Sequence, residues 1–212
     1  MRTILFQGDS ITDCGRSREG TPEVMRPADY GFGYPNLVSG TLLAANPGKY
    51  QCIDRGISGN RVVDLYARWK IDALNLKPDL ISILIGVNDV WHEFSRGNGV
   101  ETARYAQIYR MLLAWTKEVL PEVKLMILEP FMLLSEVGGE DFLADVKDHA
   151  RAAREVAEEF DAVFVPLQDK FDAAAKLAPN SYWLFDGVHP TPAGHRIIAD
   201  EWLKAAEPLL KG

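Results

Sequence analysis

The segment Gly8-Asp9-Ser10-Ile11-Thr12 follows a short apolar run, Thr3-Ile4-Leu5-Phe6, that predicts a buried β-strand at the start of the chain. A strand that ends at this segment presents a serine hydroxyl at its carboxyl end. In parallel α/β sheets, ligands bind at that edge. Asp and Ser are also preferred at helix N-caps, so a simple helix start explains the segment when it is taken alone. The rest of the chain must decide between these two interpretations.

Apolar runs and helical patterns alternate along the chain, which is typical of βαβ units and a parallel sheet. The pattern predicts a three-layer αβα sandwich of the α/β class, with right-handed crossovers. Periodicity alone does not give the strand order. The expected later strands are 50–54, 80–85, 124–128 and 162–165, and the expected helices are 34–45, 62–76, 105–119, 142–160, 167–177 and one from 192 onward.

Two features refine this outline. The polar stretch 12–33 is long for a structureless loop, which indicates that it is functional or partly helical. Trp69, Trp115 and Trp202 lie on apolar helical stripes, which predicts that they belong to the core.

Length and composition restrict the class of protein. The 212 residues predict a single domain over 1–212. Acidic residues outnumber basic ones by 30 to 23, and the net charge of −7 argues against nucleic acid or an anionic membrane as the main partner. No apolar run approaches the roughly 20 residues of a membrane span, and the N-terminal run is short for a signal peptide. We therefore expect a cytoplasmic protein that has no membrane or nucleic-acid partner.

Polar residues follow the strands at the points where ligands would bind. The predicted strands lead to Ser10, to Gly59 and to Asn88, and the last connection holds Asp186 and His189. If the strands are parallel, all of these residues lie at one edge of one sheet. A serine needs a base to become a nucleophile, histidine is the usual base, and an acid on the far ring nitrogen orients it. A tetrahedral intermediate also needs oxyanion donors, which backbone amides and an Asn side chain supply.

These residues resemble the blocks of the SGNH hydrolases, also called the GDSL esterase family. The resemblance implies a flavodoxin-like sheet of strand order 2-1-3-4-5, a nucleophile at Ser10, a base at His189 and an orienting acid at Asp186. It also implies an oxyanion hole built from Ser10, Gly59 and Asn88, with no metal or other cofactor. The matching segments are Gly8-Asp9-Ser10-Ile11-Thr12, Gly56-Ile57-Ser58-Gly59-Asn60, Gly86-Val87-Asn88-Asp89 and Asp186-Gly187-Val188-His189-Pro190.

Longer matches narrow the resemblance to the small intracellular acetylxylan esterases of this family, which remove acetyl groups from xylo-oligosaccharides. They comprise Ser-Ile-Thr-Asp-Cys-Gly-Arg from Ser10, Gly-Val-Asn-Asp-Val-Trp from Gly86 and His-Pro-Thr-Pro-Ala-Gly-His from His189. Trp91, Tyr182 and Trp183 lie close to these blocks in sequence and are candidate sugar-stacking residues. Related esterases assemble, so a homo-oligomer is also expected.

Several alternatives stay open at this stage. The same site could serve a lysophospholipase or thioesterase, which needs an apolar channel for the acyl chain. A carbohydrate-binding protein would need no Ser10–His189 hydrogen bond. A metal-dependent phosphoesterase could use Asp9, Asp13, Asn88 and His189, but histidines are scarce.

The nucleophile-elbow motif G-x-S-x-G of α/β-hydrolases is absent. Sequence leaves some roles unassigned, namely those of Asp9, Asp89, Arg55, Arg61 and His195. For His195 a structural role is favoured over a metal ligand.

Overall fold

A computed structural model describes residues 1–19 and 26–210. Five parallel strands form one sheet in the order β2-β1-β3-β4-β5. This is the predicted order, and it places the first strand next to the centre of the sheet. The strands are β1 (Arg2–Gly8), β2 (Tyr50–Asp54), β3 (Leu80–Leu84), β4 (Lys124–Leu128) and β5 (Val163–Val165).

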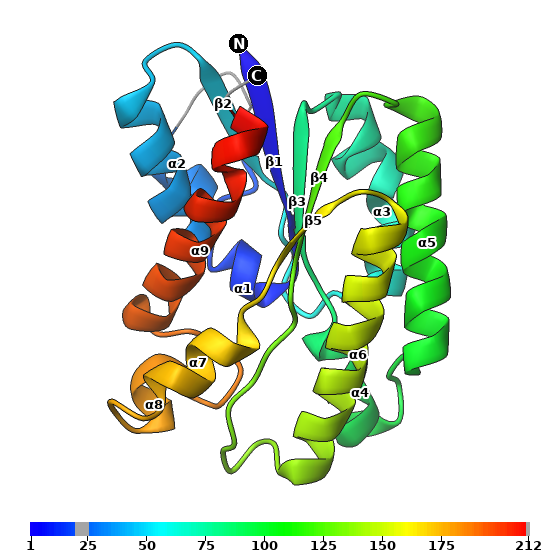
Figure 1. Ribbon diagram of the computed structural model, residues 1–212, viewed down its shortest axis with the longest axis vertical. Coiled ribbons are helices and arrows are strands. Elements are labelled where there is room, and N and C mark those ends of the chain that lie inside the picture. Colours follow the sequence, from blue (N-terminus) through cyan, green and yellow to red (C-terminus); the bar gives the residue numbers. More distant parts are fainter. Residues whose placement is uncertain (20–25, 211–212) are drawn as a thin grey trace.

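Helices cover both faces of the sheet, so the predicted three-layer sandwich is confirmed (Figure 1). One face carries α2 (Tyr34–Ala45) and α9 (Pro192–Leu210), which pack against each other. The other face carries α3 (Val62–Asp72), α5 (Thr102–Val119) and α6 (Glu140–Glu159). The remaining described helices are short or lie at the sheet edge: α1 (Ser10–Asp13), α4 (Val87–Arg96), α7 (Gln168–Ala174), α8 (Asn180–Trp183) and the 3₁₀ turns η1 (Pro27–Tyr30) and η2 (Leu74–Leu76).

A buried tryptophan anchors each face of the sheet. Trp202 of α9 packs on Phe6 with ring centroids 5.4 Å apart, and its indole nitrogen donates to Ser82 Oγ at 2.7 Å. Trp69 of α3 donates to Thr116 Oγ1 of α5 at 2.8 Å. Both rings are fully buried with their polar atoms satisfied, as buried indoles require. The prediction that these two belong to the core is confirmed.

Element boundaries follow the sequence pattern in most places. The predicted ranges 34–45, 50–54 and 124–128 match α2, β2 and β4. The helix expected over 62–76 ends earlier, at Asp72, and continues as η2. Trp115 of α5 is only half-buried and Val119 is exposed, so the end of that apolar stripe does not belong to the core. Helix α4 was not predicted at all.

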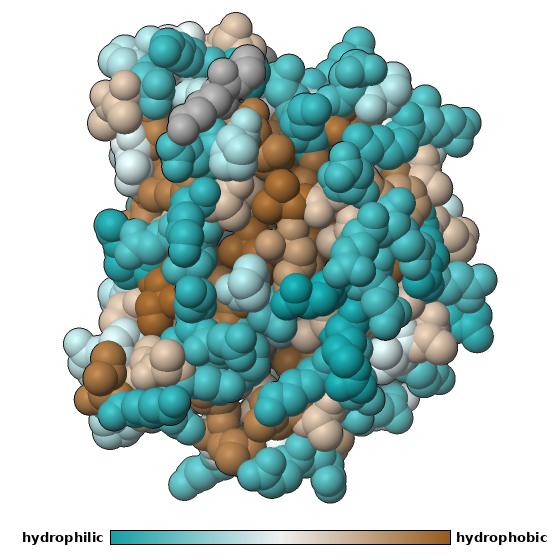
Figure 2. Space-filling model, viewed as in Figure 1, coloured by the Kyte–Doolittle hydropathy of each residue, from teal (hydrophilic) through white to brown (hydrophobic). Residues whose placement is uncertain are grey.

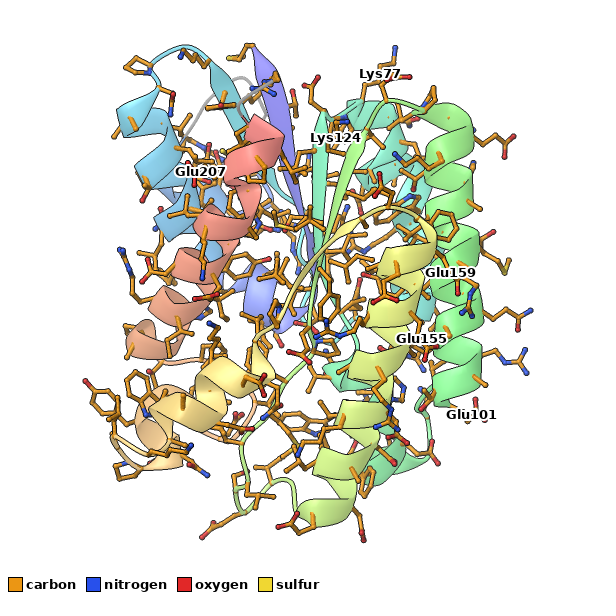
Figure 3. The ribbon with its side chains drawn as sticks, in the orientation of Figure 1. Lys77, Glu101, Lys124, Glu155, Glu159 and Glu207 are labelled. Carbon is orange, nitrogen blue, oxygen red and sulfur yellow. The ribbon has the colours of Figure 1, made fainter. Side chains whose placement is uncertain are left out.

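The surface is mostly hydrophilic in the view of Figure 2, with hydrophobic side chains gathered along its centre. Glu159, labelled in Figure 3, reaches from α6 to α5 and accepts from Arg110 at 2.6 and 2.7 Å. No helix among the described residues is long and apolar enough to cross a membrane.

Candidate active site

Ser10 begins a short helix directly after strand β1. Asp9 is the N-cap of this helix, and its Oδ1 accepts from the backbone N–H of Ile11 at 2.9 Å. A Cβ at Gly8 would lie 2.3 Å from Thr12 Oγ1 and 2.4 Å from the Leu84 carbonyl oxygen, so only glycine fits this turn. Both interpretations of this segment therefore hold: it starts a helix, and it lies at the edge of the sheet where ligands bind. The cap is what presents the Ser10 hydroxyl at the carboxyl edge of the sheet.

Ser10, His189 and Asp186 form a continuous hydrogen-bonded chain. Ser10 Oγ lies 2.8 Å from His189 Nε2, and His189 Nδ1 lies 2.6 Å from Asp186 Oδ2. Because Nδ1 faces a carboxylate it carries the ring proton, which leaves Nε2 free to accept from the serine hydroxyl. The order of groups is that of a serine hydrolase triad.

The Asp186 carboxylate is held by its own turn. Its Oδ1 accepts from the backbone N–H groups of Val188 and His189 at 3.0 and 2.7 Å. Burial alone would raise the pKa of Asp186, but these amides and the His189 ring outweigh it and lower the pKa below its usual value. The group therefore stays charged, as the partner of an imidazolium must.

The turn that carries Asp186 is anchored to the loop after β4. Ser135 Oγ donates to the Asp186 carbonyl oxygen at 2.7 Å, and the Leu133 N–H donates to the Gly187 carbonyl oxygen at 2.8 Å. Gly187 has a φ of +91°, and a Cβ there would lie 2.3 Å from Ser135 Oγ. Sequence reasoning gave no sign of this anchor, because the two loops lie about fifty residues apart.

Gly59 and Asn88 flank Ser10 from the two strands next to β1. Gly59 has a φ of +81°, a left-handed conformation that favours glycine. The Asn88 side-chain amide donates to the Asn60 carbonyl oxygen at 3.2 Å, and its second N–H has no acceptor among the residues that the structure describes. Ser10, Gly59 and Asn88 line one cavity, so the residues predicted for an oxyanion hole are brought together.

Asp13 ties the helix of Ser10 to the loop of Gly59. Its Oδ2 accepts from the Ser58 backbone N–H at 2.9 Å, from Ser58 Oγ at 3.1 Å and from Arg18 at 3.0 Å. Burial would raise the pKa of Asp13, but these donors outweigh it and the pKa lies below its ordinary value. A second tether is the Arg16 guanidinium, which donates to the Gly56 carbonyl oxygen at 2.8 Å. Sequence analysis missed the positioning roles of Asp13 and Arg16, because their bonds join positions 45 and 40 residues apart.

A cavity of about 370 Å³ opens beside Ser10 and is called the Ser10 cavity below. Trp91, one of the candidate sugar contacts, lines it and packs on His189 with ring centroids 5.6 Å apart. Tyr182 and Trp183 are not among the described lining residues. The cavity is lined by Ser10, Ser58, Gly59, Asn88, Trp91, His92, Ser95, Arg96 and His189.

The residues to which sequence analysis assigns no role make contacts that stabilise the fold around the site. Asp89 accepts from the first amide of α3, that of Val62, at 3.1 Å. Arg55 lies 4.0 Å from Asp72, and Arg61 pairs with Asp64 at 3.0 Å.

His195 is buried, accepts from the Tyr34 N–H at 3.1 Å on Nδ1 and faces Cys14 Sγ at 3.4 Å. Burial, and secondarily the His189 charge, lowers the pKa of His195 to about 4. No group of three or more potential metal ligands occurs among the described residues.

Asp9 is the other unusual carboxyl at this edge. It is fully buried, and Oδ2 has no hydrogen-bond partner among the described residues. Burial raises the pKa of Asp9 from its ordinary value near 3.8 to about 7, against the lowering effect of the Ile11 amide and the His189 charge. A buried carboxyl with one unused oxygen is therefore protonated over part of the neutral range.

The fold and the hydrogen-bonded chain together define an α/β serine hydrolase. A sequence profile of the GDSL-like lipase/acylhydrolase family matches residues 6–197. An acetylxylan esterase from Geobacillus stearothermophilus is 37% identical over 210 residues, which cover 95% of this chain and 92% of that protein. The chain therefore belongs to the GDSL-like lipase/acylhydrolase family, and it is a serine carboxylic ester hydrolase.

Solved structures agree with this assignment. A Parabacteroides merdae protein assigned as a GDSL-like lipase superposes with a TM-score of 0.90 at 42% identity, covering 96% of this chain and 94% of that one. The crystal structure of an acetylxylan esterase from Geobacillus stearothermophilus gives a TM-score of 0.86 at 33% identity, covering 97% and 94% of the two chains. The predicted family and fold are thereby confirmed.

Proposed function

We propose that this esterase removes O-acetyl groups from xylo-oligosaccharides or related acetylated sugars through an acyl-enzyme. The observation that carries the proposal is the hydrogen-bonded chain from Ser10 through His189 to Asp186, which opens on a cavity of about 370 Å³. The acetylxylan esterase relative supports the choice of substrate.

The geometry supports a two-step reaction. His189 Nε2 takes the Ser10 proton as the hydroxyl attacks the acetyl carbonyl carbon, and Asp186 stabilises the resulting imidazolium. The carbonyl oxygen gains negative charge and is met by the backbone N–H groups of Ser10 and Gly59 and the second side-chain N–H of Asn88. His189 then protonates the departing sugar oxygen. In the second step His189 takes a proton from water as the water oxygen attacks the acetyl carbonyl carbon. It then returns this proton to Ser10 Oγ as the bond between Oγ and the acetyl group breaks, which restores Ser10 and releases acetic acid, ionised to acetate at neutral pH.

The cavity favours a short acyl group on a polar alcohol. Trp91 is the one large apolar side chain among its described lining residues, and the others include serines, histidines and Arg96. A lysophospholipase or thioesterase needs an apolar channel for a long chain, which this lining does not provide. A non-catalytic carbohydrate-binding protein needs no bond between Ser10 and His189, so the 2.8 Å contact argues against it.

Acetate release from acetylated xylose and short xylo-oligosaccharides tests the proposal, with Ser10→Ala as the blank. We expect release that falls by several orders of magnitude in the variant, while its circular dichroism stays that of the wild type. Full activity in Ser10→Ala would overturn the mechanism. Faster cleavage of octanoyl than of acetyl aryl esters would instead favour the long-chain alternative.

Three predictions from the sequence accompany this proposal: a single domain, a cytoplasmic location and assembly into a homo-oligomer. Light scattering on the purified protein measures the last of these directly.

A further inference from the structure

Helix α4 turns one face toward the Ser10 cavity over its whole length. Five of its residues line the cavity, and their spacing of three, four, seven and eight positions places them on the same side of a helix. From the first to the last, the helix axis rises about 12 Å. The cavity therefore extends well past the bond that Ser10 would attack. The five residues are Asn88, Trp91, His92, Ser95 and Arg96.

Arg96 supplies a positive charge at the far end of this face. Its guanidinium donates to His92 Nε2 at 2.9 Å, and His92 is itself nine-tenths buried. Arginine can only donate, so this contact requires the His92 ring to be neutral at Nε2. His92 therefore works as a fixed acceptor that holds the guanidinium beside the cavity.

Within the described part of the chain, no carboxylate forms an ion pair with this charge. Among residues 1–19 and 26–210, Arg96 makes no ion pair, whereas the nearby Arg61 is paired with Asp64 at 3.0 Å. No Asp or Glu is among the described residues that line the cavity. A cation in the last turn of a helix also interacts favourably with the helix dipole. The dipole alone does not explain why the guanidinium is hydrogen-bonded to His92.

We propose that Arg96 is an anion subsite, and that the substrate class is acetylated oligosaccharides in which a sugar next to the acetylated one carries a carboxylate. This inference rests on the proposed function and adds the substituent that the far end of the cavity recognises. The donors of Arg96 that His92 does not use form part of a planar fork, which matches a carboxylate. The chain as a whole carries a charge of −7, so a preference for an anion must come from a local group such as this one.

A matched pair of disaccharides tests the inference. Both carry one acetyl ester on xylose; in one the neighbouring sugar is glucuronic acid, and in the other it is the neutral glucuronamide. We expect wild-type kcat/KM to favour the acid by about fivefold at low salt, the upper range for a partly exposed charge pair. High salt should reduce the preference, because the subsite is open to solvent.

Two variants distinguish an effect of Arg96 in the cavity from an effect of the net charge of the protein. Arg96→Gln should lose the preference, so that the ratio of kcat/KM for the acid over the amide falls from about five to about one. Arg104→Gln removes the same charge from an exposed position on α5 that does not line the cavity, and it should keep the preference. Equal kcat/KM for the two disaccharides in the wild type, or a preference that survives in Arg96→Gln, would overturn the proposal.

A competition assay keeps this test independent of sugar turnover. The unacetylated acid and amide disaccharides are compared as inhibitors of aryl acetate hydrolysis. Stronger inhibition by the acid in the wild type, lost in Arg96→Gln, supports the subsite even if the acetylated sugars are poor substrates. Failure of sugar ester cleavage would then count against the proposed function alone, whereas equal inhibition by acid and amide would count against Arg96.

Discussion

Replacing Asp13 by alanine should damage turnover without touching any group that contacts the ester. Asp13 Oδ2 accepts from the Ser58 backbone N–H at 2.9 Å and from the Ser58 hydroxyl at 3.1 Å. Gly59, which follows directly, supplies one of the proposed oxyanion donors. Without the carboxylate, the loop loses the two hydrogen bonds that tie it to the helix that carries Ser10.

The magnitude follows from these bonds. A hydrogen bond to a charged group contributes about 1.5–3 kcal/mol, so loss of both should lower the free energy of unfolding by about 3 kcal/mol. For a chain of this size that corresponds to a fall in Tm of roughly 6–12 °C. The exposed side chain of Arg18 adds little. Complete loss of one oxyanion donor costs about 10²–10³ in kcat, so a displaced donor should cost about tenfold to a hundredfold.

Steady-state kinetics on an aryl acetate, together with thermal melts, measure both effects. We expect the fall in kcat with KM nearly unchanged, because the lost interaction acts in the transition state. Ser58→Ala is the matched control, since it removes the hydroxyl bond and keeps the backbone bond, and its kcat should stay within about threefold of wild type. A folded Asp13→Ala enzyme with wild-type kcat would refute the reasoning.

The pH dependence of stability gives an independent check on Asp13. Its pKa is lowered in the folded state, so its contribution is complete above the ordinary carboxyl pKa and disappears as the pH falls through the folded value. The stability gap between wild type and Asp13→Ala should therefore be constant near neutrality and close below about pH 4. A gap that widens on acidification would contradict this assignment.

Three other changes have defined outcomes. Asn88→Ala should lower kcat by about 10²–10³ at unchanged fold, measured on the same ester; a loss below tenfold would remove it from the oxyanion hole. Gly194→Ala should destabilise by about 1–3 kcal/mol in thermal melts, because its Cβ would lie 2.2 Å from the Trp183 carbonyl oxygen; an unchanged Tm would contradict this clash. In the wild type, only the folded state keeps the Asp9 proton between about pH 4 and about pH 7, so the free energy of unfolding should fall as the pH rises through this range. Asp9→Asn cannot titrate, so this fall should be absent from the variant. Urea melts at pH 5 and 8 test it, and parallel curves for the two proteins would count against a raised pKa.

Sequence periodicity predicted the elements that bury an apolar face. Strand β3 is apolar except at Ser82 and fully buried, and α2 and β4 were placed to the residue, because burial on a sheet imposes a clear pattern. Periodicity did not predict helix α4, and the reason is physical. Much of its inward face borders a cavity instead of the core, so polar residues such as Asn88, Ser95 and Arg96 occupy positions where the pattern expects apolar ones.

Residues that follow the parallel strands were predicted correctly to line the cavity, whereas residues chosen for being close in sequence to Asp186 were not found to line it. Tyr182 and Trp183 precede Asp186 closely, yet their carbonyl oxygens bind the start of α9, at Thr191 Oγ1 and the Thr191 N–H, and neither side chain is among those lining the cavity. Conversely, Ser135 and Asp13 hold the site through bonds between distant loops. Such contacts depend on how the connections between strands pack in three dimensions. Local sequence patterns do not predict that packing.

The strand order explains why the candidate donors surround Ser10. Because β1 lies between β2 and β3, the loops that follow those two strands approach the same hydroxyl from opposite sides, one with Gly59 and the other with Asn88. The chain reverses its direction of winding at this point, and such switch points leave a crevice in α/β sheets. His189 reaches the crevice from the far end of the chain, on a turn held by Leu133 and Ser135 of the loop after β4. The nucleophile and oxyanion donors thus depend on the centre of the sheet, whereas the base depends on a separate anchor. Loosening that anchor should therefore impair proton transfer while leaving the Asn88 and Gly59 geometry in place.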